Sequence, residues 1–236
     1  MKVDIIIPAY NPKQHIVEAI TSCQNQSYKD IIITVIDDCS TRNWDSIKRM
    51  FPKVNFLNTP NNLGPAGARN WGAKHTHGDL ISFLDADDIM HRDKIYSSVQ
   101  RFKLKPHTGM TCGNYKILVN GRLRSKFYKR SIVVNHDRLM RQNFVASGSV
   151  TMRRDVFEEV GGFDEDYWIA EDYDLWLRCS ERYSIEYLDK VLYYYRIEPG
   201  SDSLTQRSDI QLKHLSNLDK IKAASRERMR SGLKKS

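Results

Sequence analysis

The segment that most constrains this chain is a short apolar run followed at once by three carboxylates. Leu80–Leu84 has the length and composition of a buried strand, and Asp85, Asp87 and Asp88 follow it. In an α/β protein the ligand site lies at the carboxyl edge of the sheet, where such a strand ends. Neighbouring carboxylates repel one another unless a cation lies between them, and oxygen ligands suit Mg²⁺ or Mn²⁺. We therefore expect a metal-assisted site here, although acids are also common in the first turn of a following helix.

Apolar segments around this run predict an α/β fold with a parallel, doubly wound sheet. Strands are expected at residues 3–7, 31–36 and 54–57, with helices around 16–23 and 45–51 between them. Residues 61–70 carry Gly and Pro at the spacing of a loop that opens into a helix, whose amino end favours anions. After the carboxylates, a further helix is expected to run to about residue 104.

Beyond residue 105 the pattern changes. Asn120-Gly121 separates two strand-like segments, 108–119 and 123–134, which is a strong hairpin signal. Further strands are expected at 146–152, 185–188 and 191–197, with helices at 153–160 and from residue 171. The second half therefore predicts a mixture of hairpin, strand and helix beside the parallel half.

The charge of the chain is unevenly distributed. The 236 residues carry a net charge of +8. Residues 206–236 hold nine basic and three acidic residues, and residues 113–145 hold eight basic and one acidic, so the remainder is acidic. Two separate basic patches favour anionic partners such as nucleic acid, anionic lipid or a charged substrate, or form solvated surfaces.

The last part of the chain predicts a basic amphipathic helix. Leu212, Leu215, Leu218 and Ile221 recur at helical spacing among basic residues, a pattern that fits a helix lying on an anionic membrane. No apolar run approaches the ~20 residues that a membrane span needs. No signal peptide follows Met1, and the four cysteines are far apart, so we expect a cytoplasmic protein with free thiols, peripheral to a membrane through its tail.

Four motifs at predicted strand ends point to one rim of the sheet. They are Pro8-Ala9-Tyr10-Asn11, Asp37-Asp38, Gly64 to Asn70 and Asp85-Ala86-Asp87, followed downstream by Glu171-Asp172 and a Leu-Trp-Leu-Arg178 segment. As an ordered set over roughly residues 1–196, they resemble family 2 glycosyltransferases of the GT-A fold. The resemblance implies an enzyme that transfers a sugar with inversion from a nucleotide sugar, usually a UDP-sugar. It also implies a nucleotide-sugar-binding half at 1–105, an acceptor-binding and catalytic-base half of the same domain at 106–205, and a basic tail at 206–236.

The resemblance assigns a role to each motif. Asp38 would accept from the uracil N–H, Arg69 would lie beside the base or diphosphate, and Asp85 would hold the ribose. Asp87 would bind the Mn²⁺ or Mg²⁺ that bridges the diphosphate, and Asp172 would be the general base. The remaining nucleotide-sugar-binding residues would be Pro8, Tyr10, Asn11 and Ala86.

Each of these residues also has a simpler structural explanation. Capping of the following helix would explain Asp38, and simple packing would explain Tyr10. An ion pair with a nearby Asp would explain Arg69. Asp172 fits the acid-rich first turn of a helix. One position departs from the family pattern, because Glu198 stands where many members carry a His, which leaves the role of its segment open.

The proposed chemistry needs these residue types independently of the resemblance. A departing diphosphate gains negative charge, which a cation stabilises as a Lewis acid. An acceptor hydroxyl must lose its proton, and one positioned carboxylate suffices for that. Inversion needs no second, nucleophilic carboxylate.

The acceptor is not named by the sequence. A glycan or a lipid-linked saccharide is expected by analogy with the family. The alternative is DNA carrying a hydroxymethyl base, because residues 113–145 combine basic and aromatic side chains. A non-catalytic module that binds a nucleotide sugar or nucleic acid is the alternative of another class, but a protein of that kind would be expected to lack Asp87 or Asp172.

Overall fold

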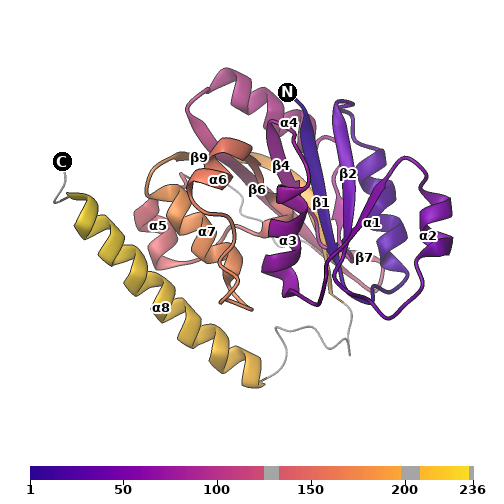
Figure 1. Cartoon of the computed structure of the whole chain (residues 1–236). Helices are drawn as coiled ribbons and strands as arrows, with labels where there is room; N and C mark the ends of the chain where they lie inside the picture. The colour runs from indigo at the N-terminus through magenta and orange to yellow at the C-terminus, as the bar shows by residue number, and fades with distance from the viewer. Residues whose placement is uncertain (125–132, 198–207, 234–236) are drawn as a thin grey trace.

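One mixed sheet with helices on both faces organises the chain (Figure 1). The structure is a computed structural model, and it describes residues 1–124, 133–197 and 208–233. Within these ranges the strands run in the order β3-β2-β1-β4-β8-β6-β9-β5, with β7 paired to β6. The strands are β1 (Val3–Ala9), β2 (Ile31–Asp37), β3 (Asn55–Asn58), β4 (Leu80–Phe83), β5 (Ile89–Met90), β6 (Thr108–Val119), β7 (Arg122–Arg124), β8 (Thr151–Arg153) and β9 (Ser184–Ile197).

The helices follow the strands closely in sequence. They are α1 (His15–Gln24), α2 (Asp45–Met50), α3 (Gly64–Lys74), α4 (Lys94–Leu104), α5 (His136–Arg141), α6 (Arg154–Glu159), α7 (Glu171–Ser180) and α8 (Ser208–Leu233), with a short 3₁₀ turn at Ser147–Ser149. The α/β class and the doubly wound arrangement predicted from the sequence are confirmed. The boundary expected near residue 105 falls between α4 and β6, inside one continuous sheet.

Alternation along the central strands builds two apolar layers. Ile5 and Ile7 of β1 pack on one face of the sheet with apolar residues of α1 and α4. Ile6, which points the other way, packs with residues of α3 and α7. Helix α3 lies close to the sheet because residue 72 is glycine, and a Cβ there would be 2.6 Å from Ile6 Cγ2. Both faces of a central strand are thus buried, which explains why these strands read as continuous apolar runs.

The second half of the chain extends the sheet with mixed pairing. β8 is antiparallel to both β4 and β6, whereas β6 and β9 are parallel. The two strands predicted at 185–188 and 191–197 are one strand, β9, whose register against β6 shifts near Gly113 and Asn114. A shift of this kind is typical of a β-bulge. The short strand β5, which pairs with β9, was not expected.

Two other predictions for the second half differ from the structure. The strand expected at 146–152 begins as a 3₁₀ turn, in which Ser149 Oγ donates to the Ala146 carbonyl at 2.7 Å, and only β8 pairs with the sheet. The hairpin at Asn120-Gly121 forms, but only 122–124 of its second strand is described. Residues 125–132 lie outside the described part, and α5 occupies a stretch for which no helix was predicted.

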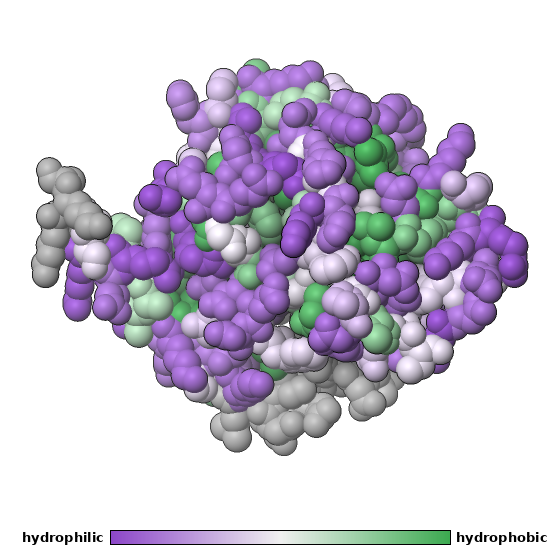
Figure 2. Space-filling model, viewed as in Figure 1, coloured by the Kyte–Doolittle hydropathy of each residue, from purple (hydrophilic) through white to green (hydrophobic). Residues whose placement is uncertain are grey.

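Helix α8 packs against the body of the protein beside α7 (Figure 1). Ile221 is fully buried and Leu218 packs on the same apolar layer, whereas Leu215 is 59% exposed. The expectation that Leu218 and Ile221 contact a membrane is therefore wrong, because the protein's own core covers them. The described residues contain no helix both long and apolar enough to cross a bilayer. The face shown in Figure 2 is mainly hydrophilic, with small separate apolar areas.

The packing of α8 predicts unequal effects of two substitutions on its apolar stripe. Ile221→Ala should lower the free energy of unfolding by about 2–5 kcal/mol, because it leaves a cavity in a closed layer. The matched variant Leu215→Ala should change it by less than about 0.5 kcal/mol, because that side chain is already in water. Urea denaturation of the whole chain measures both, and equal losses would show that α8 does not dock as described.

Candidate active site

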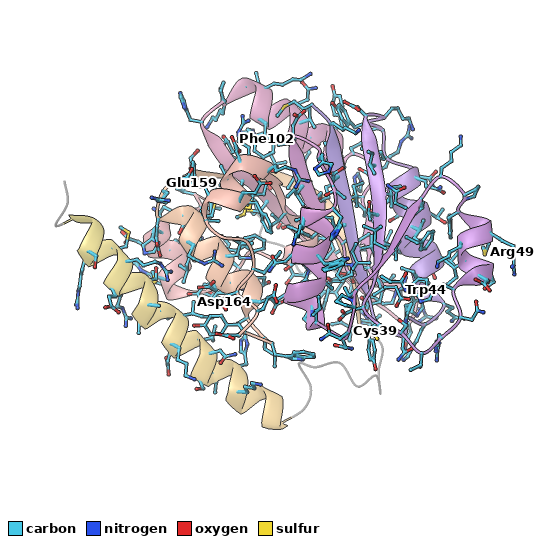
Figure 3. The ribbon with its side chains drawn as sticks, in the orientation of Figure 1. Cys39, Trp44, Arg49, Phe102, Glu159 and Asp164 are labelled. Carbon is cyan, nitrogen blue, oxygen red and sulfur yellow. The ribbon has the colours of Figure 1, made fainter. Side chains whose placement is uncertain are left out.

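The strands β1, β2 and β4 end at one edge of the sheet. They are adjacent and parallel. The Asp38 amide donates to the Ala9 carbonyl at 2.9 Å, and the Leu84 amide donates to the Ile6 carbonyl at 3.1 Å. Figure 3 labels Cys39, the neighbour of Asp38, at this edge. The structure therefore brings together the motifs that follow these three strands.

The carboxylates after β4 form a tight turn. The Asp88 amide donates to the Asp85 carbonyl at 3.1 Å, and Ala86 packs partly against the apolar layer of α1 and α4. Asp88 is buried, and its Oδ2 has no hydrogen-bond partner among the described residues. Burial, reinforced by the charges of Asp85 and Asp87, raises the pKa of Asp88 well above its ordinary value. The Asp87 side chain is exposed. Repulsion among these carboxyl groups therefore favours the neutral form of Asp88, and a cation between them would relieve it.

Arg196 holds this turn from β9. Its amide donates to Asp88 Oδ1 at 2.8 Å, and its Nε donates to the Asp87 carbonyl at 2.6 Å. Its Nη2 donates to Glu18 Oε2 of α1 at 2.8 Å. Sequence reasoning left the role of this segment open, and the structure gives Arg196 a role in fixing the Asp87 backbone. Glu198 lies outside the described residues.

Arg69 joins the two halves of the site. This α3 residue is 4% exposed, and it donates to Asp85 Oδ1 at 2.7 Å and to Glu171 Oε1 at 2.8 Å. Its guanidinium also lies 5.3 Å from the centre of the Phe163 ring. The structure confirms the alternative that Arg69 forms an ion pair with a nearby Asp, namely Asp85. Arg69 also forms a second ion pair, with Glu171 of α7. The arginine thus fixes the end of β4 to the start of α7.

The first turn of α7 holds three acidic residues, and two of them, Glu171 and Asp172, contact Arg69 and Ser147 respectively. Burial raises the pKa of Glu171 to about 7, because it outweighs the opposing effect of Arg69, and the charge of Asp172 adds to the rise. Burial likewise raises the pKa of Asp172. Ser147 in the 3₁₀ turn opposes this by donating its hydroxyl to Asp172 Oδ2 at 3.0 Å. The acids interact, so their titration belongs to the group rather than to either residue.

Asp38 has a structural role at the start of α3. Its Oδ1 accepts from the Leu63 amide at 2.9 Å and from Thr59 Oγ1 at 2.9 Å, and its Oδ2 accepts from the Gly64 amide at 2.8 Å. The alternative that Asp38 caps the helix after it is therefore wrong, because the N-cap of α2 is Trp44 and Asp38 instead accepts from the loop and the first residue of α3. Binding of a uracil N–H by Asp38 stays a prediction.

The remaining predicted nucleotide-binding residues lie along the same edge. Tyr10 is 54% exposed, so it is not a packing residue. Asn11 accepts from the Thr41 amide at 3.0 Å, and Pro8 lies in β1, half-buried. Trp168 is 42% exposed and lies over Gly64, where an added Cβ would be 2.5 Å from its ring. Two exposed aromatic side chains therefore flank the site.

Sequence reasoning missed three supporting residues. Glu171 stood beside Asp172 in a recognised motif but received no role, and Ser147 lies in a stretch read as strand. Lys94 of α4 is fully buried and donates to Ser82 Oγ at 2.7 Å beneath β4, and burial lowers its pKa to about 7. For Lys94, the sequence signal was the position of a lysine on the apolar face of the predicted helix.

The charge at the end of β4 fits a divalent cation. The buried, unpartnered Asp88 Oδ2 and the exposed Asp87 carboxylate lie in one turn. Within the described ranges, no group of three or more His, Cys, Asp or Glu side chains is placed to hold a metal ion. Mg²⁺ and similar ions are often held by one or two carboxylates, with water and substrate phosphate as the other ligands. A site of that kind matches the side chains present.

The first basic patch is described only in part. Arg122 and Arg124 of β7 are exposed. Lys126, Lys129 and Arg130, together with the aromatic residues between them, lie outside the described ranges. Three of the five basic residues expected to contact DNA therefore lie outside the described part of the chain.

Comparison with known proteins identifies the family that shares these motifs. Residues 4–161 match the model of glycosyl transferase family 2. An uncharacterized glycosyltransferase of Haemophilus influenzae is 42% identical over 117 residues, which are 48% of this chain and 46% of that protein. One of Rickettsia felis is 31% identical over 209 residues, 86% of this chain and 34% of that protein. The chain thus spans less than half the length of these two relatives.

A relative that this chain covers over most of its length and two solved structures extend the comparison. The Escherichia coli UDP-Glc:alpha-D-GlcNAc-diphosphoundecaprenol beta-1,3-glucosyltransferase WfaP is 30% identical over 212 residues, 88% of this chain and 82% of that protein. The crystal structure of S. aureus TarS 1-349 with UDP has a TM-score of 0.74 at 22% identity, covering 95% of this chain and 65% of that one. The same protein with UDP-GlcNAc gives 0.71 at 25% identity, over 85% and 60%. The likeness to TarS shows a shared GT-A fold.

The ion pairs of Arg69 predict a large, pH-dependent loss of stability. Arg69→Met should lower the free energy of unfolding by about 3–5 kcal/mol, because it leaves Glu171 buried without a partner. The pKa of Glu171 is raised in the folded state, so its contribution to stability is greatest below the ordinary value and falls as pH rises through about 7. Urea denaturation should therefore show a larger loss near pH 8 than near pH 5.

The double variant Arg69→Met/Glu171→Gln provides the control. A neutral amide has no charge to bury, so this variant should recover part of the stability and lose the pH dependence of the defect. An equal loss at both pH values in the single variant would contradict the assigned ion pair.

Proposed function

Since this chain belongs to glycosyl transferase family 2 and has the GT-A fold, we propose that it transfers a sugar, with inversion, from a UDP-sugar to a hydroxyl group of a lipid-linked saccharide. The observation that carries the proposal is the bridge through Arg69. It fixes the carboxylates at the end of β4 and the acidic start of α7 around one edge of the sheet. A donor bound at the strand ends and a base on α7 would then face the same reaction centre.

We assign the general base to Asp172. A base must reach the acceptor hydroxyl and be ionised at working pH. The Ser147 hydroxyl donates to one of its carboxylate oxygens, which fixes the side chain and favours the ionised form. The raised pKa also makes the carboxylate a stronger proton acceptor than an ordinary aspartate. Asp172 would take the hydroxyl proton as the oxygen attacks the anomeric carbon, and the diphosphate would leave from the opposite side.

The donor would bind along the ends of β1, β2 and β4. Asp85 gives one oxygen to Arg69 and has a half-exposed side chain, so its second oxygen is available for a ribose hydroxyl. Asp87 would hold Mn²⁺ or Mg²⁺, with Arg196 fixing the backbone from which it projects. When bound, such an ion supplies positive charge for the departing diphosphate. Tyr10 and Trp168 are exposed at this edge and would contact the base and the sugars.

The acceptor is proposed from the relatives. WfaP and WfgD of Escherichia coli are named for transfer to GlcNAc on diphosphoundecaprenol, and they are 30% and 29% identical to this chain. An acceptor of that class sits at a membrane surface, where the exposed basic residues of α8 would be attracted to anionic lipid. A peripheral, cytoplasmic-side location is thus part of the proposal. DNA as acceptor rests only on the basic and aromatic composition of residues 113–145, and a non-catalytic module would not need carboxylates at both Asp87 and Asp172.

Replacement of the proposed base should separate catalysis from binding. Asp172→Asn keeps the size of the side chain and its contact with Ser147 but cannot accept a proton, so turnover should fall by about 10²-fold or more. Donor affinity should change little. The rate is measured by release of UDP from a panel of UDP-sugars with a GlcNAc-diphosphate-lipid acceptor, and affinity by calorimetry with UDP. A parallel collapse of affinity would make Asp172 a binding residue.

Removal of the metal carboxylate should abolish both ion dependence and activity. We expect wild-type turnover to require Mn²⁺ or Mg²⁺, and Asp87→Ala to lose nearly all of it while the melting temperature stays close to wild type. Asp189→Ala, which removes an exposed carboxylate from the bulge of β9, serves as the matched control and should retain activity. Full turnover in excess chelator would refute the metal assignment.

A further inference from the structure

Helix α8 contacts both ends of α7, the helix that carries the proposed base. At one end, Asn217 Nδ2 donates to the Ile169 carbonyl at 3.0 Å, and Ile169 lies two residues before Glu171, the first residue of α7. At the other end, Glu181 accepts from Arg228 Nε at 2.9 Å and from Arg228 Nη2 at 2.9 Å, and Ser225 Oγ also donates to it. Ile221 lies between these contacts and is fully buried.

The spacing of these contacts matches the length of α7. Asn217 and Arg228 are eleven steps apart, which is about 16 Å along a helix at 1.5 Å per residue. The ten steps from Glu171 to Glu181 cover about 15 Å by the same rise. One rigid helix therefore holds the two ends of another, and Figure 1 shows α8 running along this side of the molecule.

The contact at Asn217 falls on a strained part of the backbone. Ala170, which follows Ile169, is buried and has φ 68° and ψ 18°, a left-handed conformation that residues other than glycine adopt only when their surroundings impose it. Its carbonyl accepts from the Asp174 amide at 3.2 Å, so its orientation sets the first turn of α7. Glu171 and Asp172 lie in that turn.

We infer that α8 is a positioning element for the reaction, and that Asn217 is the positioning residue that holds the Ile169–Ala170 backbone so that Asp172 meets the acceptor. Asn217 is buried and supplies the donor for the Ile169 carbonyl, so an apolar residue at this position would fill the layer but leave that carbonyl without this hydrogen bond. The effect on catalysis rests on the proposed function, but the role of Asn217 in holding the Ile169–Ala170 backbone does not.

The kinetic test compares Asn217→Ala with Arg228→Ala. Both variants remove one α8–α7 contact, but only the first acts on the backbone before Asp172. Asn217→Ala should lower kcat by about tenfold or more, with the KM for the UDP-sugar and the affinity for UDP within about twofold of wild type. Arg228→Ala should retain wild-type kcat even if its melting temperature falls as far. Asn217→Asp, which keeps the volume and removes the donor, replaces the alanine variant if that variant does not fold.

A second readout does not depend on turnover. Hydrogen exchange at the Asp174 amide reports opening of the first turn of α7. It should be at least about tenfold faster in Asn217→Ala than in Arg228→Ala. Glycine enters the left-handed region freely, so Ala170→Gly in the Asn217→Ala background should restore part of the slow exchange and part of kcat.

The outcomes distinguish the two proposals. Faster exchange in a chain that shows no transfer to any acceptor would support the positioning role and refute the proposed function. Normal kcat and normal exchange in Asn217→Ala, in an enzyme that Asp172→Asn inactivates, would overturn the positioning role alone. A loss of UDP affinity equal to the loss of kcat would also overturn it, because Asn217 would then act through the donor site.

Discussion

A single buried guanidinium joins the end of β4 to the start of α7 at the edge proposed to be catalytic. Arg69 reaches Asp85 after β4 and Glu171 at the start of α7, and Glu171 is 102 positions away from it in sequence. A buried arginine needs both partners, because an unpaired charge inside a protein is strongly destabilising. The positions of Asp85 and Glu171 are therefore linked. A change in one half of the sheet that displaced Arg69 would disturb the other half as well.

The layers of the fold explain why so much of its first half could be predicted. The central strands are buried on both faces, so each appears in the sequence as an uninterrupted apolar run ended by polar residues. Asp38 and Asp85 follow such runs directly, and local sequence was enough to place them on one edge. Short-range signals were sufficient because the relevant contacts follow from strand order.

The second half was predicted less well because its structure depends on distant partners. The turn at Ser147 runs without a break into the segment that forms β8, so the two were predicted as one strand, whereas Ser147 contacts Asp172 from a 3₁₀ turn. Helix α8 reads as a membrane-binding helix because its apolar stripe is obvious and its partner, α7, is far away in sequence. Ile221 is covered by the protein itself. An amphipathic pattern specifies that a face will be buried, but it does not specify by what.

The contacts of Asp38 have a consequence for how this protein can handle phosphate. Many nucleotide-binding proteins use the free amides at a helix amino end as an anion site. The amides of Leu63 and Gly64, at the start of α3, already donate to the carboxylate of Asp38, so the residue after β2 supplies an anion at this helix end. These two amides are therefore already occupied by a carboxylate of the protein itself. Under the proposed function, a diphosphate at this edge would meet acids on the neighbouring strand ends, and a bound cation would supply the balancing charge.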